Sequence, residues 1–486
     1  MTAVGTADGR FTYDVAIVGA GVVGAAIARE LSTYELRTVV LEAGHDVGTG
    51  TSKANTAIRH TGFDAKPGSL EAALLRRAYP LLGDYAAQAG IPLETPGALL
   101  VAWSPEQLAR LDALRLQAKA NGCHDVHTVS AEDLYAAEPK LGPGALGGLA
   151  VPGEGIVCPF TMPLAFATEA VTNGVRLELD TALKSIEPGA GVYELATSRG
   201  SVRARWVVNA AGLFSDLVDR MMGHERFTIH PRRGQLIVFD KLARPLVSSI
   251  LLPVPTPVSK GVLIAPTVFG NVLLGPTAED LDDRTGTQTT RQGLDDLLAK
   301  GRTILPELVD EEVTATYAGL RAATEHADYQ IHCDATQRYV CVGGIRSTGL
   351  SAAMGIAAHV VDLLQDAGVV LRRAVGHREV RMRPIGESQR RLFRDHDAIA
   401  SRPEYGEILC FCERVTRGEV LDALAGILPA RSADGLRRRT RAGLGRCQGF
   451  YCAAAISALL RDRSDVPSTP SRSADDLVAS QIPRSR

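Results

Sequence analysis

Four of the eight cysteines in the chain lie in two close pairs near the C-terminus. One residue separates Cys410 from Cys412, and four residues separate Cys447 from Cys452. Four thiolates at such spacings can hold a [2Fe–2S] cluster or a tetrahedral zinc ion, and free thiols are the third alternative. The other cysteines are isolated and are predicted to be packing residues: Cys123, Cys158, Cys333 and Cys341.

A second pattern that can do chemistry lies near the N-terminus, in YDVAIVGAGVVGAAIARELSTYELRTVVLEAG. Gly19, Gly21 and Gly24 follow a predicted buried strand and open a predicted helix. Such glycines permit a tight turn, close approach of a pyrophosphate to the backbone, and close packing of helix on strand. Glu42 ends the next predicted strand, where a carboxylate can bond ribose hydroxyls. The order of these elements predicts a dinucleotide-binding unit.

Composition limits the classes of protein to consider. The chain has 486 residues, of which 45% are hydrophobic and 22% charged, enough for several domains with a large core. The formal net charge of −2 gives no reason to expect a nucleic-acid partner. No stretch approaches the length of a membrane span, so we expect a cytoplasmic protein, with membrane contact only through a partner. Paired cysteines in a reducing compartment favour metal or redox chemistry over disulfides.

Two later segments bear on which dinucleotide is bound. RARWVVNAAGLFSD (203–216) indicates a strand running into small residues. YVCVGGIRSTGLSAAMGIAAHVVDLL (339–364) indicates a strand, a glycine turn and a helix. With the N-terminal pattern, this layout resembles the superfamily of D-amino-acid oxidase and glycerol-3-phosphate dehydrogenase over residues 12–372. The resemblance implies FAD as the cofactor.

The same resemblance implies an α/β fold in which two domains are interleaved. A Rossmann-like FAD-binding domain is expected over 12–80, 145–225 and 325–372. An α+β substrate domain with an antiparallel sheet is expected over 81–144 and 226–324.

Local signals within the substrate domain predict two of its elements. Residues 97–122 predict a strand and then a helix with Ser104 as its N-cap. Gly270 and Asn271 predict a turn between two antiparallel strands.

Two closer resemblances narrow the chemistry. NTAIRHTGFDAKPGSL and GIVCPFTMPLAFATEA are similar to the L-2-hydroxyglutarate oxidase branch. PVSKGVLIAPTVFGNVLLGPTAED, with the C-terminal cysteines, is similar to iron–sulfur relatives of glycerol-3-phosphate dehydrogenase. Both imply oxidation of a small anionic hydroxy compound.

Four residues are candidates for catalysis. Oxidising a C–H beside a hydroxyl requires a base for the hydroxyl proton and cations for an acidic substrate. The resemblance places His60 near the flavin, where it would be the base, with a hydrogen-bonded structural role as the alternative. It assigns Arg321 to a substrate carboxylate or phosphate, with a structural ion pair as the alternative. Arg346 is expected close to the flavin, and Lys260 is a weaker candidate that could be a solvated surface lysine.

Further cofactor contacts are implied only by the resemblance. They are Ala211 and Gly212 in the small-residue segment, and Gly344, Gly349 and Leu350 around the second glycine turn.

The C-terminal sequence TRAGLGRCQGFYC is similar to the bacterioferritin-associated-ferredoxin-like [2Fe–2S] domain. This resemblance implies that Cys410, Cys412, Cys447 and Cys452 hold the cluster. The expected boundaries are a charged connector over 373–404, the [2Fe–2S] domain over 405–464, and a disordered tail over 465–486. A cluster of this kind gives the two electrons of a reduced flavin an exit one at a time.

The function predicted from the sequence is an FAD-dependent dehydrogenase of a small anionic hydroxy substrate such as glycerol 3-phosphate. Its electrons would leave through the cluster to a quinone or a partner redox subunit, in a homo- or hetero-oligomer. Three alternatives stay open: a 2-hydroxyacid dehydrogenase of the L-2-hydroxyglutarate type, an amine or imino-acid dehydrogenase, and an electron-transfer subunit of a larger complex.

Overall fold

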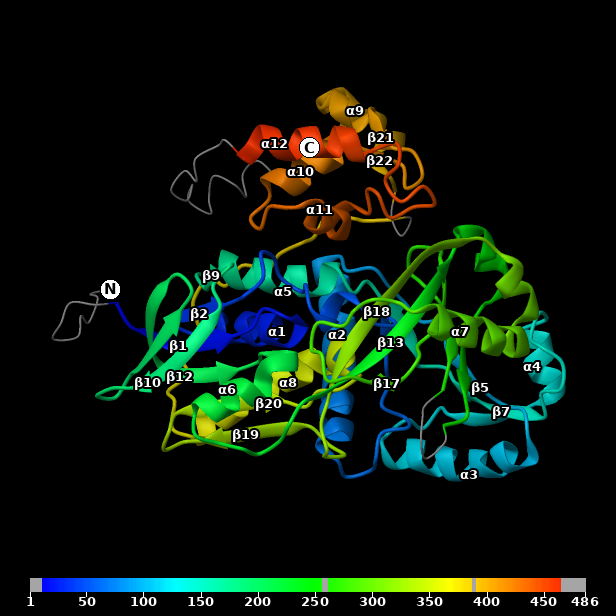
Figure 1. The fold of residues 1–486 in the computed structure, drawn as a ribbon, viewed down its shortest axis with the longest axis horizontal. Coiled ribbons are helices and arrows are strands. Elements are labelled where there is room, and N and C mark those ends of the chain that lie inside the picture. Colours follow the sequence, from blue (N-terminus) through cyan, green and yellow to red (C-terminus); the bar gives the residue numbers. More distant parts are fainter. Residues whose placement is uncertain (1–10, 256–260, 387–389, 465–486) are drawn as a thin grey trace.

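The computed structural model describes residues 11–255, 261–386 and 390–464, which form two sheet-based parts and a small C-terminal domain (Figure 1). The two sheet-based parts lie side by side, and the C-terminal domain lies against them with helix α11 (Ala433–Thr440) on the near side and α12 (Ala453–Ser464) farther away. This arrangement confirms the predicted fold class.

The first part is built on a sheet that has eight strands within the described residues. Its centre is parallel, because β9, β2, β1, β12 and β20 run in one direction as neighbours. Strands β10, β11 and β19 add antiparallel pairings. The strands are β1 (Tyr13–Val18), β2 (Thr38–Leu41), β9 (Arg176–Glu178), β10 (Leu183–Pro188), β11 (Tyr193–Thr197), β12 (Gly200–Asn209), β19 (Gln330–Asp334) and β20 (Tyr339–Gly343).

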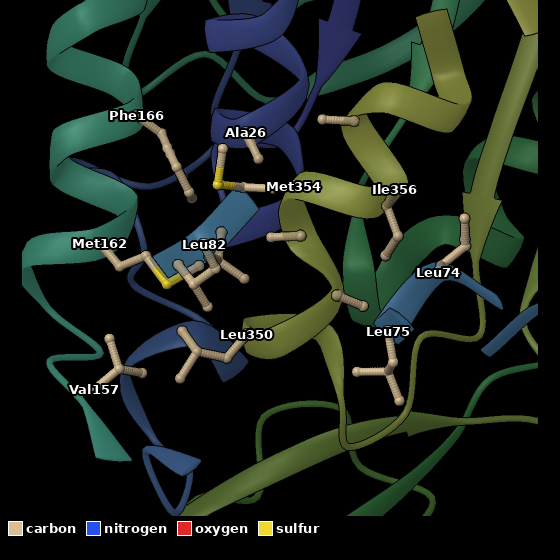
Figure 2. Close-up of a cluster of buried hydrophobic side chains, with 14 of the residues drawn as sticks. Ala26, Leu74, Leu75, Leu82, Val157, Met162, Phe166, Leu350, Met354 and Ile356 are labelled. Atoms are coloured by element: carbon tan, nitrogen blue, oxygen red, sulfur yellow. The ribbon is translucent and has the colours of Figure 1, made fainter. Parts of the chain in front are cut away.

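Helices pack against this sheet and supply much of the core. They are α1 (Val22–Leu31), α2 (Leu70–Ala89), α5 (Thr161–Thr172), α6 (Ser215–Met221) and α8 (Gly349–Asp366). Figure 2 shows side chains of α1, α2, α5 and α8 meeting in one cluster, with Phe166, Leu82 and Ile356 almost fully buried. Small residues such as Ala26 on α1 let these helices approach closely. The close-packed core therefore fixes the positions of α1 and α8 relative to the strands.

The second part is built on a sheet in which nine strands are described, and its pairings are antiparallel except for β14 with β5. Helices α3 (Pro105–Ala120), α4 (Ala131–Ala137) and α7 (Arg291–Ile304) accompany it. The strands are β5 (Ala98–Ala102), β6 (His127–Ser130), β7 (Gly147–Val151), β13 (His230–Phe239), β14 (Ile250–Pro253), β15 (Leu263–Pro266), β16 (Val272–Gly275), β17 (Glu279–Asp280) and β18 (Val313–Ala323).

Local predictions within this part are confirmed. Ser104 caps α3 by accepting a hydrogen bond from the amide of Gln107, and β5 precedes it. Strands β15 and β16 pair across the turn that contains Gly270 and Asn271.

Two of the expected domain boundaries need correction. The boundary at residue 80 falls inside α2, which runs on to Ala89 in spite of Pro80. The boundary at residue 145 assigns β7 to the FAD-binding part, but β7 pairs with β5 and β6 in the second sheet. Sequence alone cannot assign β7, because its partners are chosen by pairing between separate segments of the chain.

A small sheet connects the two parts. Its strands are β3 (Ile58–Arg59), β4 (Leu93–Glu94) and β8 (Gly155–Val157). Arg59 pairs with Gly155, so the residues that follow β3 and precede β8 lie opposite one another.

The C-terminal domain contains β21 (Ile408–Cys410), β22 (Val415–Thr416), α10 (Arg417–Ala425), α11 and α12. Thr416 begins α10 with a capping box to Glu419. Within the connector, α9 (His396–Ser401) precedes this domain, and Arg383 and Arg402 pair with Asp422 on α10.

Two predictions fall on parts of the chain that the structure does not describe. These are the site residue Lys260 and the expected disordered tail over 465–486. Across the described ranges, none of the helices has the length and apolar character needed to cross a membrane.

Candidate active site and cluster domain

The predicted cofactor residues gather at one edge of the first sheet. Gly19 follows β1, Glu42 follows β2, Ala211 follows β12 and Gly344 follows β20, at the carboxyl ends of neighbouring parallel strands. In open α/β sheets, ligands bind at this edge.

The glycine turn has the geometry that a pyrophosphate requires. Gly19 has φ of 102°, in the region that favours glycine, and a Cβ there would lie 2.6 Å from the carbonyl oxygen of Ala210. A Cβ at Gly24 would lie 2.0 Å from the carbonyl oxygen of Gly19, so helix and turn could not approach as they do with any other residue. These close backbone contacts fix the turn at the N-terminus of α1, whose free amides suit the pyrophosphate of a dinucleotide.

Glu42 lies where a ribose contact is expected. Its carboxylate accepts hydrogen bonds from the amides of Ala20, at 2.6 Å, and Gly44, at 2.7 Å. These bonds fix the carboxylate beside the glycine turn and leave further lone pairs for ribose hydroxyls.

The second glycine turn leads into α8. Gly344 has φ of 61°, and Gly349 begins the helix. The side chain of Leu350 packs in the core (Figure 2), so only its backbone amide, in the first turn of α8, is available to a cofactor. Gly212 follows Ala211 and has φ of 56°. The residue before them, Ala210, packs against Gly19 of the first glycine turn.

A cavity of about 420 Å³ lies between the two parts of the molecule. It is lined by strands of the second sheet, by the small connecting sheet, and by loops and the first turns of α2 and α8 in the first part. Among the residues that line it are His60, Asp64, Glu71, Glu154, Arg232, Arg321, Arg346 and Ser351.

Arg321 is a partly buried cation without a carboxylate partner among the described residues. It stands on β18 directly opposite Arg232 of β13, and its closest hydrogen bond is a long one of 3.3 Å to the carbonyl oxygen of Thr277. Burial and, to a smaller extent, the positive charge of Arg232 together lower the pKa of Arg321 to about 10. Two like charges opposite each other on neighbouring strands are destabilising. An anion between them would remove that cost.

His60 is held between two carboxylates. Its Nδ1 lies 2.9 Å from Glu154 and its Nε2 lies 3.0 Å from Asp64. Burial opposes the charged imidazolium, but Glu154 and Asp64 outweigh it and raise the pKa of His60 to about 10. While both contacts are made, His60 is protonated at neutral pH, so it can accept a proton only after Asp64 moves away from Nε2.

Arg346 lines the cavity but already has a partner. Its guanidinium bonds Glu71 at 2.6 Å, while its Nε is buried and unpaired. Glu71 also accepts from the hydroxyl of Thr348 at the start of α8. The ion pair therefore ties α2 to the second glycine turn.

Sequence reasoning missed three acidic residues of this site. Asp64 lies four residues after His60, which is a usable local signal, whereas Glu154 and Glu71 reach the site from distant segments. Glu154 is only 1% exposed and accepts three hydrogen bonds on one oxygen, from His60 and from the amide and hydroxyl of Thr61. It orients His60.

The four C-terminal cysteines come together as two pairs. Cys412 and Cys447 are hydrogen-bonded through their side chains, and so are Cys410 and Cys452. Within the described residues they do not form a closed group of three or more metal ligands. Four neighbouring sulfurs in two pairs are a suitable ligand set for the two irons of a [2Fe–2S] cluster.

Backbone amides around these sulfurs favour the thiolate form. The amides of Tyr451, Gly449 and Phe450 point at Cys447, and they lower the pKa of its thiol. The amide of Gly443 donates to the sulfur of Cys410 at 3.5 Å. Such donors also stabilise the negative charge of a bound cluster.

Comparison with known protein families agrees with this geometry. The family described as FAD dependent oxidoreductase matches residues 14–363, and the BFD-like [2Fe-2S] binding domain matches residues 408–462. The chain belongs to the FAD-dependent oxidoreductases. The enzyme therefore uses FAD and carries a [2Fe–2S] domain, as the sequence predicted.

Individual relatives narrow the family further. The enzyme is 34% identical over 455 residues to a glycerol 3-phosphate dehydrogenase of Caloramator mitchellensis, covering 92% of this chain and 94% of the relative. It is 31% identical over 279 residues to the mitochondrial L-2-hydroxyglutarate dehydrogenase of Caenorhabditis elegans, covering 55% of this chain and 63% of the relative.

A solved structure shows the same fold. The L-alpha-glycerophosphate oxidase of Mycoplasma pneumoniae, dithionite-reduced with FAD bound, superposes with a TM-score of 0.73 at 29% identity, over 77% of this chain and all of that one. The predicted class of enzyme, glycerol-3-phosphate dehydrogenase-like, is confirmed.

Proposed function

We propose that the enzyme oxidises glycerol 3-phosphate, or a closely similar phosphorylated polyol, in the cavity between the two sheets. The observation that carries this proposal is the pair Arg321 and Arg232. A partly buried guanidinium that has no carboxylate partner among the described residues stands opposite a second guanidinium. The relative that aligns over nearly the whole chain is named for the same substrate.

Arg321 is proposed to bind the phosphate. Its guanidinium can donate two parallel hydrogen bonds to phosphate oxygens, and its burial makes each bond stronger than in water. Arg232 adds a second positive charge on the neighbouring strand, although Asp280 shares its donors at 2.6 and 2.9 Å. A dianion gains from both charges, so this pair favours phosphate over a singly charged group.

His60 is proposed to take the hydroxyl proton. Glu154 holds its Nδ1, which leaves Nε2 as the atom that exchanges protons. Asp64 occupies Nε2 at 3.0 Å, and a substrate hydroxyl that displaces Asp64 would remove one of the causes of the raised pKa. The residue thus becomes a base when the substrate is in place.

Bound FAD supplies the hydride acceptor of such a dehydrogenase, and a [2Fe–2S] cluster carries electrons singly. The protein's contribution is to hold the substrate by its phosphate and to orient the hydroxyl toward His60. The electron acceptor beyond the cluster is proposed to be a quinone or a partner redox protein. Arg346 is proposed to act close to the flavin, and Lys260, outside the described residues, stays a weaker candidate for a substrate role.

One alternative has an observation of its own. Similarity to L-2-hydroxyglutarate dehydrogenase covers 55% of the chain, and Arg321 could equally bind a carboxylate. The two substrates differ in the charge and geometry of the anionic group, so they can be separated by experiment.

The test compares glycerol 3-phosphate, L-2-hydroxyglutarate, L-proline and unphosphorylated glycerol as electron donors to a dye acceptor. We expect kcat/KM for glycerol 3-phosphate to exceed that for glycerol by at least tenfold, because a charge-assisted contact contributes about 1.5–3 kcal/mol. Arg321→Ala should abolish this preference, while Arg291→Ala, at a side chain that is 95% exposed on α7, should keep it. A preference that survives Arg321→Ala would refute the assignment.

A further inference from the structure

A buried ionic network joins the cluster domain to the segment that follows β2. Asp46 accepts hydrogen bonds from Arg438 at 2.6 Å and from two nitrogens of Arg439 at 2.6 and 2.9 Å. All three side chains are no more than 6% exposed. Arg438 also donates to the carbonyl oxygen of Val47 at 2.7 Å.

The same helix holds the far end of this segment. Lys53 pairs with Asp434, in the first turn of α11, at 3.1 Å. Asp434 in turn pairs with Arg438 at 3.3 Å. Residues 46–53 are therefore fastened to α11 at both ends.

The segment also contacts the glycine turn directly. The amide of Gly48 donates to the carbonyl oxygen of Ala20 at 2.9 Å. The amide of Val22, the first residue of α1, donates to the hydroxyl of Ser52 at 2.8 Å. Glu42, at the start of the segment, accepts from Ala20.

We propose that Asp46 is a positioning residue that makes α11 of the cluster domain part of the FAD site. Arg438 and Arg439 hold Asp46, and through it the segment 42–53 against the glycine turn, so FAD is retained well only when the cluster domain is folded in place. The proposal rests on FAD lying at the glycine turn.

Loading of the cluster reaches α11 through the core of the small domain. Leu436 of α11 is fully buried in one cluster of side chains with Cys410 and Cys452. Cys447 follows α11 by seven residues, after Gly443, whose amide bonds the sulfur of Cys410. Loss of the cluster loosens the packing of Leu436 against Cys410 and Cys452 and the loop that joins α11 to Cys447. The carboxylate of Asp46 then loses its two guanidiniums.

Linkage makes the effect reciprocal. If a loaded cluster domain tightens FAD binding, bound FAD must tighten the hold on the cluster by the same factor. Each cofactor thus protects the other, and Asp46 transmits the coupling.

The test follows the release of FAD from the purified holoenzyme, as the rise in flavin fluorescence after dilution. We expect Asp46→Asn to speed release at least tenfold, and Cys447→Ser/Cys452→Ser, which removes cluster ligands, to do the same. Combining Asp46→Asn with the cysteine changes should add little, because all act through one contact.

Asp14→Asn is the matched control. Asp14 pairs with Arg37 and Arg205 at the start of β1, at the opposite end of the strand from the glycine turn. Asp14→Asn also loses a contact with two arginines, although a more exposed one, at the end of β1 away from the glycine turn. Its FAD release rate should therefore stay within twofold of the wild type. Release from Asp46→Asn that also stays within twofold would overturn the proposal.

A second measurement uses only the wild-type enzyme, so it does not depend on a variant that folds. Hydrogen exchange of residues 42–53 in the wild-type enzyme should speed up when a chelator removes iron, and bound FAD should slow that removal. Unchanged exchange would overturn the coupling. Neither readout involves substrate, so failure here is distinct from failure of the proposed reaction, which would leave FAD release unaltered.

Discussion

Two sites in the molecule bring a pair of arginines together, and the protein supplies carboxylates to the two pairs in different ways. At the domain interface, Arg438 and Arg439 share the carboxylate of Asp46. In the cavity, Arg321 faces Arg232, and no carboxylate among the described residues pairs with Arg321. The pKa of Asp46 shows the match: burial alone would raise it, but bonds from Arg439 and the charges of both arginines lower it overall.

Whether a carboxylate of the protein pairs with the arginines distinguishes a structural site from a binding site. A buried charge is costly unless it is paired, so an arginine pair that is neutralised by the protein serves the fold. An arginine such as Arg321, which no carboxylate among the described residues neutralises, keeps its cost until an anion binds, and that cost is recovered as binding energy. Substitutions that remove a charge from either site, and ligands that add one, test this difference.

The largest expected effect is at the interface. Asp46→Ala leaves two buried guanidiniums without the carboxylate that they share, and breaking such a buried pair costs about 3–5 kcal/mol. We expect the midpoint of denaturant unfolding to fall accordingly, while Arg321→Ala leaves it unchanged or higher. A loss of stability in Arg321→Ala as large as in Asp46→Ala would show that the cavity pair is structural too.

The next effect is ligand stabilisation of the cavity. Glycerol 3-phosphate at 100 times its Kd should stabilise the folded enzyme by about 2.7 kcal/mol. The thermal midpoint measured anaerobically should therefore rise with added ligand in the wild type and stay flat in Arg321→Ala. An equal rise in both proteins would place the anion elsewhere.

A third effect concerns His60 and pH. The pKa of His60 is raised to about 10, so the imidazolium form prevails below that pH. Asp64→Asn removes one of the two carboxylates that raise it, so the limb of the pH profile that reports loss of this proton should move to lower pH. A shift of one unit corresponds to 1.36 kcal/mol. A profile of kcat/KM that does not move, or moves upward, would exclude His60 as the proton acceptor.

The smallest expected effect is at the rim of the cavity. Arg232 and Asp280 are 44% and 60% exposed, and such pairs contribute about 0–1 kcal/mol. Asp280→Asn should free Arg232 for the substrate and lower KM for glycerol 3-phosphate by no more than about fivefold, at unchanged kcat. A rise in KM would mean that Asp280 orients Arg232 productively.

The sequence predicts those parts of the site whose residues lie close together in the chain. The glycine turn has a fixed spacing because one turn supplies the whole arrangement. The four cysteines come from two short segments, each with a recognisable spacing of its own. Arg321 was found through resemblance, and its opposite neighbour Arg232 became visible only with the register of β13 and β18.

Long-range pairs could not be predicted in the same way. Asp46 and Arg439 are 393 residues apart, and each is an unremarkable charged residue in its own segment. Glu154 meets His60 only because β8 pairs with β3. Pairing of this kind depends on the packing of the whole fold, which a single sequence does not reveal.

The central claim is that an anionic substrate held by Arg321 delivers its electrons to the cofactors of this chain. The most direct measurement is an anaerobic titration of the purified enzyme with glycerol 3-phosphate, following the absorbance of flavin and cluster. We predict that both bands bleach in the wild type at concentrations where Arg321→Ala shows no change. Bands that stay oxidised with glycerol 3-phosphate but bleach with L-2-hydroxyglutarate or L-proline would contradict the proposed substrate.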